Sequence, residues 1–288
     1  MRKYEKWVGY SFIAPTVIFL LLLMIYPLFH SFYISLTDAR VGTVGKYIGL
    51  ANYKTLFHQD IFIQALVNSA IYTIFSVILK TALGLLLAML LEKAKYGKSV
   101  LRAVLLLPWV VPASMSVLAW QWMFDPTYSL INWILVQLGG KAISWLGSPF
   151  WARTAVITIN VWRGIPFFAI GFTAGLTSIP IELYESASMD GAGEIRKFFR
   201  ITLPLLMPVF SIILLYSIVQ TISDFETIFI LTRGGPMEST HLLGTVAFFI
   251  GLAGTELGKG AAISLFIFPV LFMAAFFAIR TVIKNENF

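Results

Sequence analysis

One charged residue lies where a charge is costly. Arg163 is embedded in the apolar stretch 152–177, about eleven residues from its start. At 1.5 Å per residue of helix, it would lie about 16 Å below the outer end of this stretch, close to the middle of a bilayer. A charge at that depth costs at least about 2.5–3.5 kcal/mol. We therefore expect the side chain to face the interior of a bundle or a water-filled cavity.

Two neighbours on the same helix face suggest what Arg163 does there. Asn160 lies three positions before it and Phe167 four positions after it, so all three share one face. An amide, a guanidinium and an aromatic ring suit a polyol, whose hydroxyls need hydrogen-bond partners and whose C–H faces stack on rings. The pattern predicts that this face lines a solute path. A structural pairing of Arg163 with a carboxylate or with backbone carbonyls remains an open alternative.

The chain has none of the usual signs of an enzyme. The nearest approach to a phosphate-binding loop, residues 254–260, has the wrong glycine spacing and lacks the hydroxyl residue. His30, His58 and His241 are scattered, and there is no cysteine, so neither a metal-ligand pattern nor a thiol nucleophile is present. We expect no catalytic residue and no metal site.

Composition indicates a membrane protein. Of 288 residues, 58% are hydrophobic and 12% are charged, whereas a soluble domain carries about 25% charged residues. Mean hydropathy is +0.84. Six apolar stretches are long enough to cross the hydrocarbon core: 9–36, 63–91, 103–124, 152–177, 203–229 and 261–283. The shorter stretch 242–252 is predicted to be interfacial or re-entrant. The expected fold class is all-α, a polytopic membrane bundle of six transmembrane helices.

Basic residues predict the orientation. Of the 21 lysines and arginines, twelve fall in one set of loops and seven in the opposite set, while Lys80 and Arg163 lie inside spans. The richer set faces the cytoplasm by the positive-inside rule, so both termini are expected to be cytoplasmic. Small residues four positions apart, Gly84 with Ala88 and Gly171 with Gly175, predict close packing between helices.

The segment between the fourth and fifth spans predicts a short cytoplasmic helix. Pro180 is placed in its first turn, where proline is tolerated, and Glu185 favours the positive end of the helix dipole. Gly191 is a natural C-terminal stop. Tyr184 and Ala187 share a face with Gly191, which gives a compact projection that could dock into a groove on a partner.

The spacing in this segment is similar to a known motif. Glu185-x-Ala187-x-x-x-Gly191, then nine residues, then Ile201-x-Leu203-Pro204, resembles the EAA loop of binding-protein-dependent ABC importer permeases. Ser186 stands where the family usually has alanine. In that family the loop, here 178–203, is the coupling helix seated in a cleft of the nucleotide-binding subunit. The resemblance implies that the ATPase-coupling residues are Tyr184, Glu185, Ala187, Asp190, Gly191 and Ala192.

The resemblance covers residues 60–285 and is strongest to the carbohydrate branch, the maltose-type and glycerol-phosphate-type permeases. It is carried by three further stretches, Leu107–Pro112, Asn160–Phe167 and Leu231–Pro236. It implies a type I ABC importer permease fold, with an N-terminal span and external loop at 1–62, a permease core at 63–283 and a tail at 284–288. The implied solute-path residues are Trp109, Asn160, Arg163, Gly164, Phe167, Ser223, Asp224 and Phe225.

The resemblance also implies the function and the partners. The chain would carry a sugar or oligosaccharide across the bacterial cytoplasmic (inner) membrane by alternating access. Its partners would be a second, non-identical permease subunit, two ATPase subunits, an extracytoplasmic solute-binding protein and the lipid bilayer, with no nucleic acid. No cofactor would bind this chain, since ATP and Mg²⁺ belong to the ATPase.

Two alternatives stay open at this point. A permease of the same class could carry a polyamine, an amino acid or glycerol phosphate. A secondary transporter would need coupling carboxylates within the membrane, and the spans are almost free of them apart from Asp224 and Glu226.

Overall fold

The computed structural model describes residues 3–94 and 96–286, and within these ranges the regular elements are helices. The first half holds α1 (Lys3–Ser35), α2 (Ala51–Leu56), α3 (Asp60–Lys93), α4 (Lys98–Val110), α5 (Ala113–Met123) and α6 (Leu130–Gln137). The central part holds α7 (Pro149–Thr177), α8 (Ile181–Met189), α9 (Glu194–Lys197), the π-helix η1 (Phe198–Thr202) and α10 (Leu203–Ile222). The last part holds α11 (Glu226–Leu231), α12 (Leu243–Phe248), the π-helix η2 (Phe249–Ala253), α13 (Leu257–Leu265) and α14 (Ile267–Glu286).

The chain divides into two compact units. The first comprises Met1–Phe62 with Val246–Phe266, and the second comprises Ile63–Thr245 with Ile267–Phe288. In the first unit α13 packs against α1, α2 and η2. A β-carbon at Gly251 would lie 3.0 Å from the Gly260 Cα, so η2 and α13 meet backbone to backbone. The segment 246–266, which the sequence placed inside the permease core, therefore packs with the N-terminal part.

Five helices are long and apolar enough to span a membrane, and a sixth span is counted if a bent pair is taken as one. The bent pair is α4 and α5, which meet at 92°. The span predicted over 103–124 therefore falls on this bent pair, and it counts as one crossing only if the two helices are taken together. Val111 is extended, with φ −68° and ψ 133°, because the ring of Pro112 disfavours the helical conformation at the preceding residue.

The predicted short apolar helix is also present. Residues 243–253 form one apolar helix too short to be counted as a span, as expected from the sequence. Its placement at the membrane interface stays a prediction.

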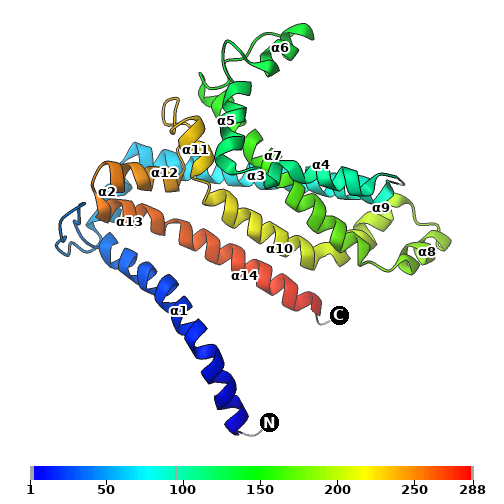
Figure 1. The fold of residues 1–288 in the computed structure, drawn as a ribbon, viewed down its shortest axis with the longest axis horizontal. Helices are drawn as coiled ribbons and strands as arrows, with labels where there is room; N and C mark the ends of the chain where they lie inside the picture. Colours follow the sequence, from blue (N-terminus) through cyan, green and yellow to red (C-terminus); the bar gives the residue numbers. More distant parts are fainter. Residues whose placement is uncertain (1–2, 95, 287–288) are drawn as a thin grey trace. The chain divides into compact units, whose positions relative to one another are not determined.

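Glycines allow close packing between helices of the second unit. There α10 packs along both α7 and α14 (Figure 1). A β-carbon at Gly171 would lie 2.5 Å from Ile213 Cδ1, and one at Gly175 would lie 2.5 Å from Leu206 Cδ1. The predicted close packing is confirmed at this pair, and also at Gly84, where a β-carbon would collide with Phe168 of α7. Without the glycines, α10 could not come this near to α7.

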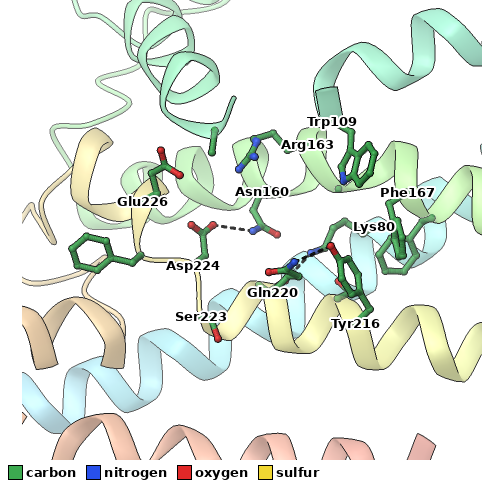
Figure 2. A pocket seen from close by; sticks show the side chains of 16 residues that line it. Lys80, Trp109, Asn160, Arg163, Phe167, Tyr216, Gln220, Ser223, Asp224 and Glu226 are labelled. Atoms are coloured by element: carbon green, nitrogen blue, oxygen red, sulfur yellow. Dashed lines mark hydrogen bonds between the residues drawn. The ribbon is translucent and has the colours of Figure 1, made fainter. Parts of the chain in front are cut away.

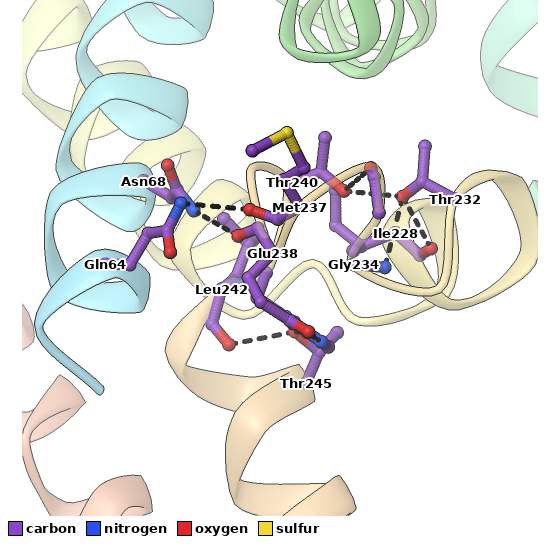
Figure 3. A network of polar contacts seen from close by, with 12 residues as sticks. Gln64, Asn68, Ile228, Thr232, Gly234, Met237, Glu238, Thr240, Leu242 and Thr245 are labelled. Atoms are coloured by element: carbon purple, nitrogen blue, oxygen red, sulfur yellow. Dashed lines mark hydrogen bonds and ion pairs between the residues drawn. The ribbon is translucent and has the colours of Figure 1, made fainter. Parts of the chain in front are cut away.

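The loop between α11 and α12 is held by polar contacts to its own backbone and to neighbouring helices (Figure 3). Asn68 Nδ2 of α3 donates to the Glu238 carbonyl at 3.0 Å, and Arg153 Nε of α7 donates to the Ser239 carbonyl at 2.9 Å. Gly234 has φ +93°, and a β-carbon there would collide with the His241 ring. Burial lowers the pKa of His241, and the Glu238 carboxylate partly offsets this. These contacts give the loop a defined shape.

Candidate functional site

A cavity of about 390 Å³ opens in the second unit, at the middle of α7 and the far end of α10 (Figure 2). Its lining also includes Trp109 of α4, Lys80 of α3 and the segment that joins α10 to α11. All eight residues that the sequence assigned to the solute path lie around this one cavity: Trp109, Asn160, Arg163, Gly164, Phe167, Ser223, Asp224 and Phe225.

Asp224 is the most heavily hydrogen-bonded group in the lining. It lies just past α10, which ends at Ile222. Its Oδ2 accepts from Tyr72 Oη at 2.6 Å and from Asn160 Nδ2 at 3.0 Å. Its Oδ1 accepts from the Thr227 backbone nitrogen at 3.2 Å. These donors come from α3, α7 and α11, so one carboxylate joins three helices at the cavity.

Lys80 reaches the cavity across α7. Its side chain passes over Gly164, where a β-carbon would collide with the lysine Cδ. Its Nζ donates to Thr221 Oγ1 of α10 at 2.7 Å, and the residue is only 4% exposed. Gly164 thus gives the aliphatic part of Lys80 room to cross, which is a packing reason for a residue that the resemblance had assigned to the solute path.

Arg163 and Asn160 each keep hydrogen-bonding capacity unused. The Arg163 Nε and the Asn160 Oδ1 are buried and have no hydrogen-bond partner in the described part of the chain. Within those same residues, Arg163 makes no ion pair closer than 4.0 Å. Arg163 as a whole is half-buried, and a pairing with a carboxylate, one of the alternatives that the sequence left open, is not seen among these residues. Both residues line the cavity.

An aromatic wall, made of Trp109, Phe167 and Tyr216, forms another side of the cavity. The Phe167 and Tyr216 ring centroids lie 4.5 Å apart, and those of Trp109 and Phe167 lie 6.4 Å apart and near-parallel. Gln220 Nε2 donates to Tyr216 Oη at 2.8 Å, which fixes the outer ring. The aromatic wall, with rings from α4, α7 and α10, therefore lies in the same cavity as the polar groups around Asp224 (Figure 2).

Sequence reasoning did not assign six polar lining residues to the site: Lys80, Tyr216, Ser217, Gln220, Thr221 and Glu226. Lys80 carried a usable signal, since a lysine within an apolar span needs a polar partner. Gln220 precedes Ser223 and Asp224 by three and four positions, and Tyr216 precedes them by seven and eight, but only the packing of α10 shows which face they occupy.

The predicted coupling residues gather at α8. Pro180 is the residue before the helix rather than part of its first turn. Gly191 has φ +74°, as the predicted helix stop requires. The Ala192 nitrogen donates to the Ala187 carbonyl at 2.9 Å and the Gly191 nitrogen donates to the Ser188 carbonyl at 3.0 Å, which is a Schellman ending.

The six predicted coupling residues differ in exposure. Glu185, Asp190 and Gly191 are exposed, whereas Tyr184, Ala187 and Ala192 are half-buried. After them the chain forms α9, which has only four residues, Glu194–Lys197, and then the π-helix η1, which leads into α10.

Comparison with known proteins decides the family. Residues 80–285 match the family described as "Binding-protein-dependent transport system inner membrane component". The chain belongs to this family. It is therefore a multi-pass inner-membrane permease of a binding-protein-dependent importer, and family membership shows that it is a transport component rather than an enzyme or a secondary transporter.

Relatives match the chain over nearly its whole length. It is 37% identical to the trehalose/maltose transport system permease protein MalF of Thermococcus litoralis, over 94% of this chain and 92% of that one. It is 33% identical to the sulfoquinovosyl glycerol transport system permease protein SmoG of Agrobacterium fabrum, over 92% and 87%. A solved bacterial alginate ABC transporter, in complex with an alginate pentasaccharide-bound periplasmic protein, is similar with a TM-score of 0.81 at 25% identity, over 96% and 93%. The predicted type I importer permease fold is confirmed.

The Asp224 contacts generate a stability prediction. Tyr72→Phe keeps the buried ring and removes one donor to the carboxylate, so the permease should lose about 1.5–3 kcal/mol of stability. The measurement is thermal unfolding of the purified transporter. Tyr216→Phe is the matched control, because its hydroxyl lies on an exposed side chain and bonds only Gln220 among the described residues, and it should change stability by about 0.5 kcal/mol or less. Equal losses in the two variants would contradict the importance of Asp224.

Proposed function

We propose that this permease carries a sugar or oligosaccharide across the cytoplasmic membrane by alternating access, with the cavity as part of its path. The observation that carries the proposal is the cavity lining, in which the aromatic wall lies together with the polar side chains of Arg163 and Asn160. Sugars have C–H faces that stack on rings and hydroxyls that need both donors and acceptors. The Arg163 guanidinium supplies donors, and the Asn160 amide can both donate and accept.

Two further observations support a sugar. The relatives are named for trehalose, maltose and sulfoquinovosyl glycerol, and the structural neighbour was solved with an alginate pentasaccharide on its periplasmic protein. The cavity lining holds two cations, Lys80 and Arg163, and two carboxylates, Asp224 and Glu226. Asp224 already accepts three hydrogen bonds, so a polyamine would meet one available carboxylate beside an unpaired arginine. A polyamine, amino-acid or glycerol-phosphate permease has no specific observation in its favour.

We further propose the partners that the chain works with: a second, non-identical permease, two ATPase subunits and an external solute-binding protein. The exposed part of α8, with Glu185, Asp190 and Gly191, would dock on an ATPase subunit. ATP and Mg²⁺ would then be held by that subunit, and no cofactor by this chain. Support comes from the family name and from the periplasmic protein in the similar complex.

For the orientation, we propose that both termini face the cytoplasm, since the basic loops predict it. Reporter fusions after residues 50, 98, 138, 192, 240 and 286 should report out, in, out, in, out and in. The bent pair of α4 and α5 is then one crossing. A cytoplasmic signal at 240 would contradict this orientation.

The sugar path is tested by Arg163→Gln and Asn160→Leu, made separately. Each removes a group that bonds a neutral solute, so the apparent affinity for uptake should fall about two- to tenfold while the complex still assembles. Thr158→Val is the control on α7, because its hydroxyl bonds within the helix, to the Thr154 carbonyl at 2.8 Å. If Arg163→Gln prevents folding of the complex while Asn160→Leu transports normally, Arg163 is a structural residue and the pocket assignment is wrong.

The docking role of α8 is tested by Glu185→Lys and Gly191→Val. The first reverses an exposed charge, and the second forces a β-branched residue to φ +74°, at about 1–3 kcal/mol. Expression should be normal, with loss of ATPase co-purification or of solute-stimulated hydrolysis. Gly193→Val is the control, since this glycine has φ −69° and open space around it. Unchanged uptake in both test variants would rule out the docking role.

A further inference from the structure

One side-chain hydrogen bond leaves α8. Tyr184 Oη lies 2.9 Å from Thr202 Oγ1. Among the described residues it is the only side-chain hydrogen bond between α8 and another element; the Ser188 hydroxyl bonds within the helix. Most other side chains of α8 are exposed. Within the described residues, the Tyr184 hydroxyl is therefore the one side-chain group of α8 that hydrogen-bonds another element of its unit.

Thr202 sits at a special place in the chain. It is 6% exposed, and it is the last residue of η1, directly before α10 begins at Leu203. Single π-helical turns inside helices are frequent at functional sites. Because η1 and α10 are continuous, Thr202 joins a helix that runs about 29 Å to Thr221 at 1.5 Å per residue.

The other end of α10 reaches the cavity. Tyr216, Ser217, Gln220 and Thr221 of α10 all line it. Thr221 Oγ1 accepts from the buried Lys80 Nζ at 2.7 Å. A polar contact thus holds each end of this helix, to α8 at Thr202 and to α3 at Thr221.

A proline inside α10 could weaken it as a rigid connection. Pro208 removes one backbone hydrogen bond of the helix. However, Leu206 and Ile213 lie on either side of it and press into Gly175 and Gly171 of α7. Both side chains are fully or nearly fully buried. The proline is therefore braced by α7, the helix that carries Asn160, Arg163 and Phe167 on the cavity.

We propose that the Tyr184–Thr202 hydrogen bond is the joint that passes displacement of α8 to the α7–α10 pair and so to the cavity, which makes Thr202 a positioning residue for transport. The proposal rests on the docking of α8 proposed above. Thr202 itself is buried and can act only through Tyr184 and α10. Its hydroxyl matters because a bond fixes the direction of movement between two helices more strictly than apolar contact does.

The test uses Thr202→Val in the assembled transporter, with Thr202→Ser as the conservative variant. Thr202→Val should keep ATPase co-purification and basal hydrolysis, because Thr202 is not on the docking surface. Solute transported per ATP should fall about fivefold, the shift expected for the loss of one net hydrogen bond. Thr202→Ser should restore it. Tyr184→Phe in the Val background should add little further loss in uptake per ATP, since both changes remove the same bond.

Three results would contradict the proposal that the Tyr184–Thr202 hydrogen bond passes displacement of α8 to the cavity. They are uptake per ATP unchanged in Thr202→Val, a loss that Thr202→Ser does not restore, or additive losses with Tyr184→Phe. Tyr96→Phe, which changes a tyrosine that is 90% exposed, is the control and should leave coupling unchanged. Failure of the docking proposal looks different: the ATPase would then fail to associate with the unmodified chain, or Glu185→Lys and Gly191→Val would both leave uptake unchanged.

Discussion

The arrangement of the second unit depends on a polar contact in an apolar setting. Asp224 accepts hydrogen bonds from Tyr72, Asn160 and the Thr227 nitrogen, while Lys80 bonds Thr221 close by. A buried polar group without partners costs several kcal/mol in hydrocarbon. The helices α3, α7, α10 and α11 must therefore meet at this point, and the cavity forms where they meet.

Small residues make that meeting possible along the rest of the helices. Gly84 admits Phe168, and Gly171 and Gly175 admit Ile213 and Leu206. Between lipid-facing helices there is no gain from removing apolar surface from water, so close van der Waals contact has to supply the attraction. The glycines and the polar contacts have separate effects, because the former set how near α7 and α10 come and the latter set their register at the cavity.

The sequence predicted features that depend on local spacing. The Arg163 face, the glycine pairs and the helix stop at Gly191 follow from helical periodicity and from single-residue conformational preference. The break at Val111 was missed, because a proline within a span is tolerated in many bundles and only the packing decides whether it bends the helix. Glu226 and Gln220 were missed as lining residues because their faces depend on how α10 ends and α11 begins, which no repeat in the sequence records.

Some polar side-chain atoms of the cavity residues have no hydrogen-bond partner among the described residues. Ten buried side-chain atoms of the described residues have no hydrogen-bond partner, and three of them belong to residues that line the cavity: Asn160, Arg163 and Ser217. Asp224 is shared by other donors, and Asn160 turns its amide nitrogen to that carboxylate, while its oxygen has no hydrogen-bond partner among the described residues. Among the described residues, Asp224 therefore holds the Asn160 side chain, while the Arg163 Nε and the Asn160 Oδ1 have no hydrogen-bond partner. Such an arrangement is costly in an empty site and favourable when a molecule with hydroxyl groups occupies it.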